Sequence, residues 1–215
     1  MIANCLDKHI YEGRYKSADS VPFDPTPLLL LHVTHRQTAT AAHDGGRGSG
    51  QGRGYGRGRG GRNGNNNDNN HRDRALYSND DEARKVVELL LNRYKSDDVL
   101  VLSPYKDQVK SIHRWIDSFF GSADVHRATE LKDRVITLDQ SQGQEADVVI
   151  VSLTNPRPTR FLDSKRLNVL FSRARSKFVL ITDEVVLREY VRSNKHNDKR
   201  LELVHDLLNI SSPFV

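Results

Sequence analysis

Two short apolar runs, each following a compact cluster of polar residues, most constrain the fold of this chain. The runs are Val148–Leu153 and Phe178–Thr182, and both are rich in β-branched or other apolar residues with almost no interruption. Runs of this length and character are typical of strands buried on both faces of a parallel sheet. The pattern predicts an α/β domain with a mostly parallel sheet flanked by helices.

The polar clusters have the residue types that a cleft for a phosphorylated ligand needs. The first run follows Gln142, Gly143 and Glu145, and the second follows Arg166, Asn168, Arg173 and Arg175. Glycine lets the backbone approach a ligand closely. A carboxylate can accept hydrogen bonds from a ribose, and arginine forks onto phosphate oxygens.

At these residues the chain resembles a known family. Residues 142–152, Q-G-Q-E-A-D-V-V-I-V-S, resemble motif V of superfamily 1 helicases, and residues 166–175, R-L-N-V-L-F-S-R-A-R, resemble motif VI. The closest similarity is to the branch of the regulator of nonsense transcripts and senataxin. Motif VI there usually reads R-L-N-V-A-x-T-R-A-R, from which Leu170 and Ser172 depart.

The resemblance implies half of a two-domain motor. In the family, two RecA-like domains clamp ATP with Mg²⁺; the first brings the phosphate-binding loop and the metal-binding acids, and the second brings motifs V and VI. This sequence contains no G-x-x-x-x-G-K-[ST] segment and no strand followed by metal-binding acids. It therefore resembles the C-terminal, second RecA-like (P-loop NTPase-type, three-layer) domain. ATP with Mg²⁺ is expected to bind only together with a first RecA-like domain, in cis or in trans.

By the same resemblance, Arg173 is the catalytic residue, an arginine finger that reaches the γ-phosphate. The expected nucleotide contacts are Gln142, Gly143, Glu145 and Arg173, with Gln142 also coupling nucleotide to nucleic acid. A surface salt bridge is the alternative for Arg173, and a structural ion pair is the alternative for Glu145.

A second motif indicates contact with single-stranded RNA or DNA. Residues 103–108, S-P-Y-K-D-Q, follow the strand predicted over Val99–Leu102 and open a helix that ends at Phe120. They resemble the family's T-P-Y-x-x-Q segment, and the end of a parallel strand is where open α/β sheets bind ligands. Ser103, Tyr105 and Thr137 are the candidate contacts. In the alternative interpretation Tyr105 is packed and Gln108 is solvated.

The remaining elements follow from periodicity and caps. A helix is predicted over Ser78–Tyr94, capped by Asn79 with Glu82, and the acids at its start fit a helix N-terminus better than a metal site. In the helix after residue 105, Tyr105, Val109, Ile112, Ile116 and Phe119 form the expected buried face. Further expected elements are strands Leu28–Val33 and Val135–Leu138, an approach loop at Arg127–Asp133, and helices Ile2–Ile10, Arg166–Ser172, Glu184–Ser193 and Leu201–Leu208.

The segment Thr34–Asp73 has low complexity. Eleven of the 14 glycines and five arginines, but no acid, lie between Gly45 and Gly64. Subtracting these five arginines from the 33 basic residues leaves 28, which equals the number of acidic residues, so the remainder of the chain is neutral. Such a segment has too little apolar surface to offset the ~1–2 kcal/mol per residue of backbone ordering and is expected to be disordered. Its Arg53, Arg57 and Arg59 are candidate contacts to nucleic acid, and a passive spacer is the alternative.

The expected domain organisation is a second RecA-like domain interrupted by an insertion. Residues 1–33 begin that domain, residues 34–75 form the insertion, and residues 76–210 complete the domain. Residues 10–14, I-Y-E-G-R, resemble a family segment that follows Q-Y-R-M, and Q-Y-R-M is absent, so the domain is expected to be truncated at its N-terminus.

Composition excludes several classes of protein. The single cysteine, Cys5, rules out an internal disulfide and fits a reducing compartment. No run approaches the ~18 apolar residues of a membrane span, so an intracellular protein of the nucleus or cytoplasm without a membrane partner is expected. The histidines lack the partners of a zinc site, and no metal site is expected.

The leading hypothesis is the second motor domain of an ATP-dependent RNA or DNA helicase, inactive by itself. A truncated, non-catalytic module that binds RNA through its Arg-Gly segment is the alternative, and a fragmentary gene product is a third possibility.

Overall fold

The computed structural model describes residues 2–11, 14, 28–34, 77–95, 97–157 and 163–214. Within these ranges the chain forms a six-stranded sheet in the order β3-β2-β4-β5-β1-β6, and every neighbouring pair is parallel. The strands are β1 (Leu28–His32), β2 (Val99–Ser103), β3 (Val135–Thr137), β4 (Ala146–Ser152), β5 (Ala174–Thr182) and β6 (Ser212–Pro213). The predicted α/β class with a parallel sheet is confirmed, and each predicted strand is present. The short β6 is an addition.

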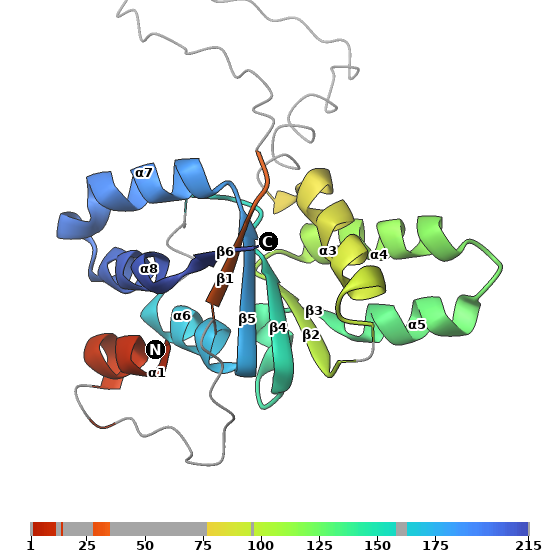
Figure 1. Cartoon of the computed structure of the whole chain (residues 1–215), viewed down its shortest axis with the longest axis horizontal. Coiled ribbons are helices and arrows are strands. Elements are labelled where there is room, and N and C mark those ends of the chain that lie inside the picture. The colour runs from red at the N-terminus through yellow and green to blue at the C-terminus, as the bar shows by residue number, and fades with distance from the viewer. Residues whose placement is uncertain are drawn as a thin grey trace, which may run out of the picture.

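The helices lie in two layers, one on each face of the sheet (Figure 1). One layer holds α3 (Asp80–Asn92), α4 (Lys106–Phe120) and α5 (Val125–Asp133). The other holds α1 (Ile2–Leu6), α6 (Ser164–Ser172), α7 (Glu184–Asn194) and α8 (Lys199–Ile210). Three single-turn elements complete the described chain: the π-helical η1 (Asp7–Tyr11) and the 3₁₀ turns η2 (Leu138–Ser141) and η3 (Lys195–Asn197).

The sheet separates two hydrophobic cores because successive side chains of a strand point to opposite faces. On β5, Phe178 and Leu180 pack toward α6, α7 and α8, whereas Val179 and Ile181 pack toward α3 and α4. This two-sided burial explains why the central strands read as unbroken apolar runs in the sequence.

Two expectations about the α3–α5 layer are wrong. The loop expected over Arg127–Asp133 is part of helix α5, whose N-cap Asp124 accepts a hydrogen bond from the backbone N–H of Arg127. Phe119, expected on the buried face of α4, is 64% exposed, while Ile112 and Ile116 are fully buried. The apolar pattern continues into the last turn of α4, but the core of this layer includes only Ile112 and Ile116 among its fully buried residues from that helix.

Parallel strands give the sheet two distinct edges. We call the edge where the strands begin the amino edge and the edge where they end the carboxyl edge. The chain returns from the end of β3 to the start of β4 through residues 138–145, which include η2, and β2 lies between these two strands. One short connector therefore links the two edges, and it carries the Q-G-Q-E sequence at its end.

None of the helices in the described ranges has the length and apolar character required of a membrane span.

Candidate functional site

The predicted nucleotide contacts meet at the amino edge. Glu145 directly precedes β4 and Arg173 directly precedes β5, two adjacent strands whose first residues, Ala146 and Ala174, are paired in register. The backbone N–H of Ala146 donates to the carbonyl oxygen of Arg173 over 3.1 Å. Gln142, Gly143 and Glu145 are all exposed, and Arg173 is half-buried. The two polar clusters, which the sequence interprets as parts of a cleft for a phosphorylated ligand, therefore lie next to each other at this edge.

The guanidinium of Arg173 is held by oxygens of its own chain. Its Nε donates to the carbonyl oxygen of Val169 at 3.1 Å, one terminal nitrogen donates to the carbonyl oxygen of Gln144 at 3.1 Å, and the other donates to the hydroxyl of Ser172 at 3.1 Å. None of these acceptors carries a formal charge. A phosphate would replace neutral acceptors with charged ones, and charge-assisted hydrogen bonds are about twice as strong.

The turn before β4 depends on Gly143. Its φ of 82° lies in the left-handed region, which glycine adopts without a steric penalty. A Cβ at this position would meet no atom within 4 Å, so the requirement comes from backbone conformation and not from space. The open surroundings also leave the turn accessible to a ligand.

The other arginines of the second cluster are engaged in ion pairs. Arg175 donates to Asp147 at 2.8 Å and to Asp98 at 2.6 Å, and the hydrogen bond to Asp147 is the main cause of the raised pKa of Arg175. Arg166 contacts Asp139 at 3.2 Å and Asp163 at 3.6 Å. These two residues tie elements together, which leaves Arg173 as the arginine of this cluster without a carboxylate partner among the described residues.

Asn168 of the second polar cluster has a structural role in α6. Its side-chain amide donates to the hydroxyl of Tyr11 over 2.7 Å, across 157 residues of sequence. This hydrogen bond connects the N-terminal helical segment to α6, the helix whose C-cap is Arg173.

The predicted contacts to single-stranded nucleic acid lie at the opposite, carboxyl edge. Ser103 and Thr137 end β2 and β3 and are paired in register. Ser103 is fully buried, and its hydroxyl accepts from the backbone N–H of Tyr105 at 3.2 Å. Thr137 is 6% exposed and donates from its hydroxyl to Gln140 at 2.7 Å. Both hydroxyls are therefore used within the fold, and the part of this edge open to a ligand is made by neighbouring residues.

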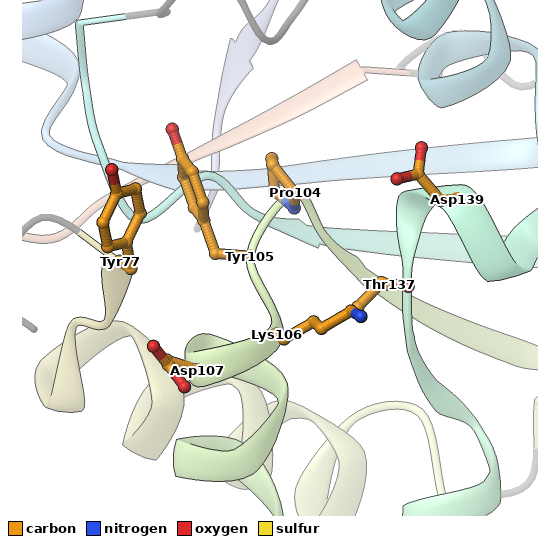
Figure 2. Close-up of a pocket in the computed structure, with 7 residues that line it drawn as sticks. All are labelled: Tyr77, Pro104, Tyr105, Lys106, Asp107, Thr137 and Asp139. Atoms are coloured by element: carbon orange, nitrogen blue, oxygen red, sulfur yellow. The ribbon is translucent and has the colours of Figure 1, made fainter.

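A cavity of about 420 Å³ lies at this edge, as Figure 2 shows. The rings of Tyr77 and Tyr105 form one wall, with centroids 5.2 Å apart and planes inclined by 55°. Thr137 and Pro104 contribute to its lining, and the charged residues around it are Lys106, Asp107 and Asp139. Tyr77 is not among the candidates from the sequence, although a tyrosine two residues before a helix cap is visible there.

A buried polar network lies at the carboxyl end of β4. The carboxyl group of Glu82 accepts from the hydroxyl of Ser152 at 2.6 Å and from the backbone N–H of Thr154 at 2.9 Å. Thr154 has a φ of 69°, a left-handed conformation that costs energy for a residue with a Cβ. Glu82 and Ser152 are both fully buried, so these hydrogen bonds hold the carboxyl end of β4 in that conformation.

Gln108 belongs to the same network, and the alternative in which it is solvated is wrong. It is fully buried, donates to Ser152 at 2.8 Å and to the carbonyl oxygen of Asn79 at 3.0 Å, and accepts from the backbone N–H of Asn79 at 2.6 Å. Asn79 caps α3 as predicted, by accepting from the backbone N–H of Glu82. The alternative in which Tyr105 is packed holds, since it is 9% exposed.

Arg53, Arg57 and Arg59, and the Arg-Gly segment as a whole, lie outside the described residues. In the described part of the chain, no group of three His, Cys, Asp or Glu residues is arranged to hold a metal ion.

Comparison with known proteins shows two similarities. A family model described as an AAA domain matches residues 1–204. An uncharacterised ATP-dependent helicase from Methanocaldococcus jannaschii is 32% identical over 116 residues. That alignment covers 53% of this chain and 16% of the relative. The chain therefore spans a small part of the curated relative that it matches.

Proposed function

Because this chain belongs to the AAA domain family, we propose that it serves as the second motor domain of an ATP-dependent helicase. In this role it closes on ATP held by a first RecA-like domain, supplies Arg173 to the γ-phosphate and carries part of the path of a single strand. The observation that most supports the proposal is the amino edge, where the half-buried Arg173 donates to the carbonyl oxygen of Gln144 in the exposed Q-G-Q-E turn.

The chemistry of the amino edge fits the closing half of a nucleotide cleft. Arg173 would exchange three neutral acceptors for phosphate oxygens, and stabilising the charge of the transition state in this way is worth roughly 10³–10⁵ in rate. Glu145 would accept hydrogen bonds from the ribose, and the open turn at Gly143 would let the backbone approach. The phosphate-binding loop and the Mg²⁺ ligands would come from the first domain, because the described residues offer no acidic cluster for a metal.

A connection between the Q-G-Q-E turn and Arg173 supports coupled movement. The carbonyl oxygen of Gln144 accepts from Arg173, so withdrawal of the guanidinium toward a phosphate would free the turn next to Gln142. In this proposal Gln142 reports nucleotide binding along the connector, which is the coupling role that the family resemblance implies.

A second candidate is a non-catalytic module that binds RNA through its Arg-Gly segment. The specific observation in its favour is where that segment is attached. Thr34 follows the carboxyl end of β1, and Tyr77 lines the cavity at the carboxyl edge, so the described residues on either side of the segment with Arg53, Arg57 and Arg59 both lie at this edge.

The motor role is tested by ATP turnover. The 215-residue chain alone should show no measurable hydrolysis, and a two-domain protein that joins it to a first RecA-like domain should hydrolyse ATP. In that protein Arg173→Ala should lower kcat by about 10³-fold or more. Arg192→Ala, an exposed arginine on α7, is the matched control and should leave kcat unchanged.

Two results would contradict the proposal. One is ATP hydrolysis by the pure chain that Arg173→Ala abolishes, since this would mean that no first domain is needed. The other is full activity of the Arg173→Ala two-domain protein. If RNA binding also disappears when residues 45–64 are deleted, the module interpretation replaces the motor.

A further inference from the structure

The cavity at the carboxyl edge has an aromatic wall that is ordered in advance. Tyr77 is 42% exposed, and its inner side packs against the ring of Tyr105, whose own exposure is 9%. In Figure 2 the two rings stand side by side with their hydroxyls on the same side, and Pro104 continues the wall toward Asp139. Flat aromatic surfaces of this kind bind nucleobases by stacking, at little cost in side-chain entropy because the ring is already held.

The charges around the cavity favour a base over a phosphate. The lining holds one cation, Lys106, and two carboxylates, Asp107 and Asp139, each of which is paired with a cation outside the lining, Lys110 and Arg166 respectively. A phosphate would meet like charges here. A neutral base would not, and the N-terminus of α4 adds only a partial positive charge to the same place.

The carboxylates also determine which bases fit. Asp107 accepts from Lys110 at 3.1 Å, and Asp139 accepts from Arg166 at 3.2 Å, in both cases through Oδ1. Hydrogen bonds from described residues to each carboxylate go to Oδ1, which leaves Oδ2 to accept from a ligand. A carboxylate can accept from the exocyclic amino group of cytosine, adenine or guanine, whereas uracil and thymine present two carbonyl oxygens on either side of a single ring N–H and have no amino group.

We propose that this cavity is a subsite for one unpaired base that bears an exocyclic amino group. The base stacks on Tyr77, whose ring contacts that of Tyr105, and its amino group donates to Asp107 or Asp139. The subsite rests on the proposed path of a single strand along the carboxyl edge and adds base selectivity to it. Its volume of about 420 Å³ lies within the range of small-ligand pockets and admits one base with its sugar.

The test compares strands that differ only in the amino group. Fluorescence anisotropy at fixed salt would measure binding of the 215-residue chain to 12-nucleotide homopolymers of cytosine and of uracil, as RNA and as DNA. The basic Arg-Gly segment would bind all four strands without base preference, so the cytosine-to-uracil ratio isolates the cavity. We expect the cytosine strands to bind about fivefold or more tightly. Agreement between the RNA and DNA pairs would assign the effect to the base.

Substitutions then assign the preference to residues. Tyr77→Ala should weaken binding of the cytosine strand by roughly 5- to 100-fold, and Tyr77→Phe should retain it, because stacking needs the ring and not the hydroxyl. The double variant Asp107→Asn with Asp139→Asn should bring the ratio close to one, since an amide can donate to uracil. Phe119→Ala, at the other end of α4, is the exposed aromatic control and should change nothing.

Equal affinity for cytosine and uracil strands would overturn the subsite, as would a Tyr77→Ala variant that binds like the parent. Absence of binding to every strand would also overturn it. The ATP-turnover test concerns residues of the opposite edge, so failure of the subsite leaves the result for Arg173 standing and the two failures can be told apart.

Discussion

At the residue scale, Glu82 is a buried acid that stabilises the fold, although acids at the start of this helix could also be interpreted as catalytic. It is fully buried in the first turn of α3, where negative charge is favourable, and it accepts from Ser152 and from the backbone N–H of Thr154. Those two donors belong to the end of β4, and Thr154 has the positive φ that the carboxyl group helps to hold. Glu82 therefore fixes the carboxyl end of β4 from a different element.

Removal of this carboxyl group should be costly. Glu82→Ala would leave the hydroxyl of Ser152 and the N–H of Thr154 buried without their acceptor, and we expect the free energy of unfolding to fall by about 3 kcal/mol. Glu88→Ala on the same helix removes a partly exposed glutamate that pairs with Arg84 and Lys85, and it should cost no more than about 0.5 kcal/mol. Urea denaturation of the two variants measures the difference. Equal losses would mean that the network does not stabilise the fold.

Single residues also mark the limit of prediction from the sequence. Gly143, Glu145 and Arg173 could be placed at one edge because parallel strands fix which ends of the chain lie together. The hydrogen bonds that Arg173 donates to Val169, Ser172 and Gln144 could not be predicted. Two of the three acceptors are backbone carbonyl oxygens, which carry no signature in the sequence. The sequence does not determine whether Gln108 is solvated or buried, because an amide near a helix start is equally compatible with solvent and with a buried partner on a strand.

At the scale of elements, the longer strands and most helices could be predicted from the sequence, whereas helix α5 could not. Helix α5 buries only Ala128 and Leu131, which is too sparse a pattern to indicate a helix, and its N-cap Asp124 stands among glycine and serine residues that favour a turn. The short β6 could not be predicted either. One of its two residues is a proline, and it is an outermost strand that pairs with β1 alone.

Attachment of the N-terminal segment depends on a cluster that the sequence does not reveal. Asp206 of α8 lies 2.6 Å from Lys8 and 2.9 Å from His9, and His205 contacts it at 3.4 Å. The hydrogen bond from Lys8 is the main cause that lowers the pKa of Asp206 below its ordinary value, followed by that from His9. The cluster clamps η1 to α8.

The clamp should make stability depend on pH in the acid range. The pKa of Asp206 in the folded chain lies below the value of about 3.9 for an aspartate in an unfolded chain. The stabilisation is therefore complete above that value and is lost as the pH falls through the folded-state pKa. Asp206→Asn should lower the free energy of unfolding by about 1 kcal/mol at pH 6–7, as expected for a partly exposed pair. The difference between parent and variant should shrink from about pH 4 downward in urea titrations, and a difference independent of pH would contradict the clamp.

At the scale of the whole molecule, the two candidate sites lie on opposite edges of one sheet and share one short connector. Thr137 marks the connector's start at the carboxyl edge, beside the cavity, and Glu145 marks its end at the amino edge, beside Arg173. The start is fixed by a capping box: Gln140 accepts from the backbone N–H of Thr137 at 3.0 Å and from its hydroxyl at 2.7 Å. Residues 138–145 form a short connector without an α-helix. A displacement at one end of the connector is therefore transmitted to the other end through few residues.

This geometry predicts that Gln140 couples the two edges without touching either ligand. In the two-domain protein that joins this chain to a first RecA-like domain, Gln140→Ala should leave basal ATP turnover unchanged, because Arg173 and the turn at Gly143 keep their own contacts. Stimulation of turnover by a single strand should fall several-fold, since Thr137 would lose both hydrogen bonds that fix the start of the connector. Gln144→Ala, which keeps the backbone carbonyl that Arg173 uses, is the matched control and should retain stimulation. Full stimulation of the Gln140→Ala variant would show that the edges communicate by another route, such as α6, whose Arg166 contacts Asp139 within the connector.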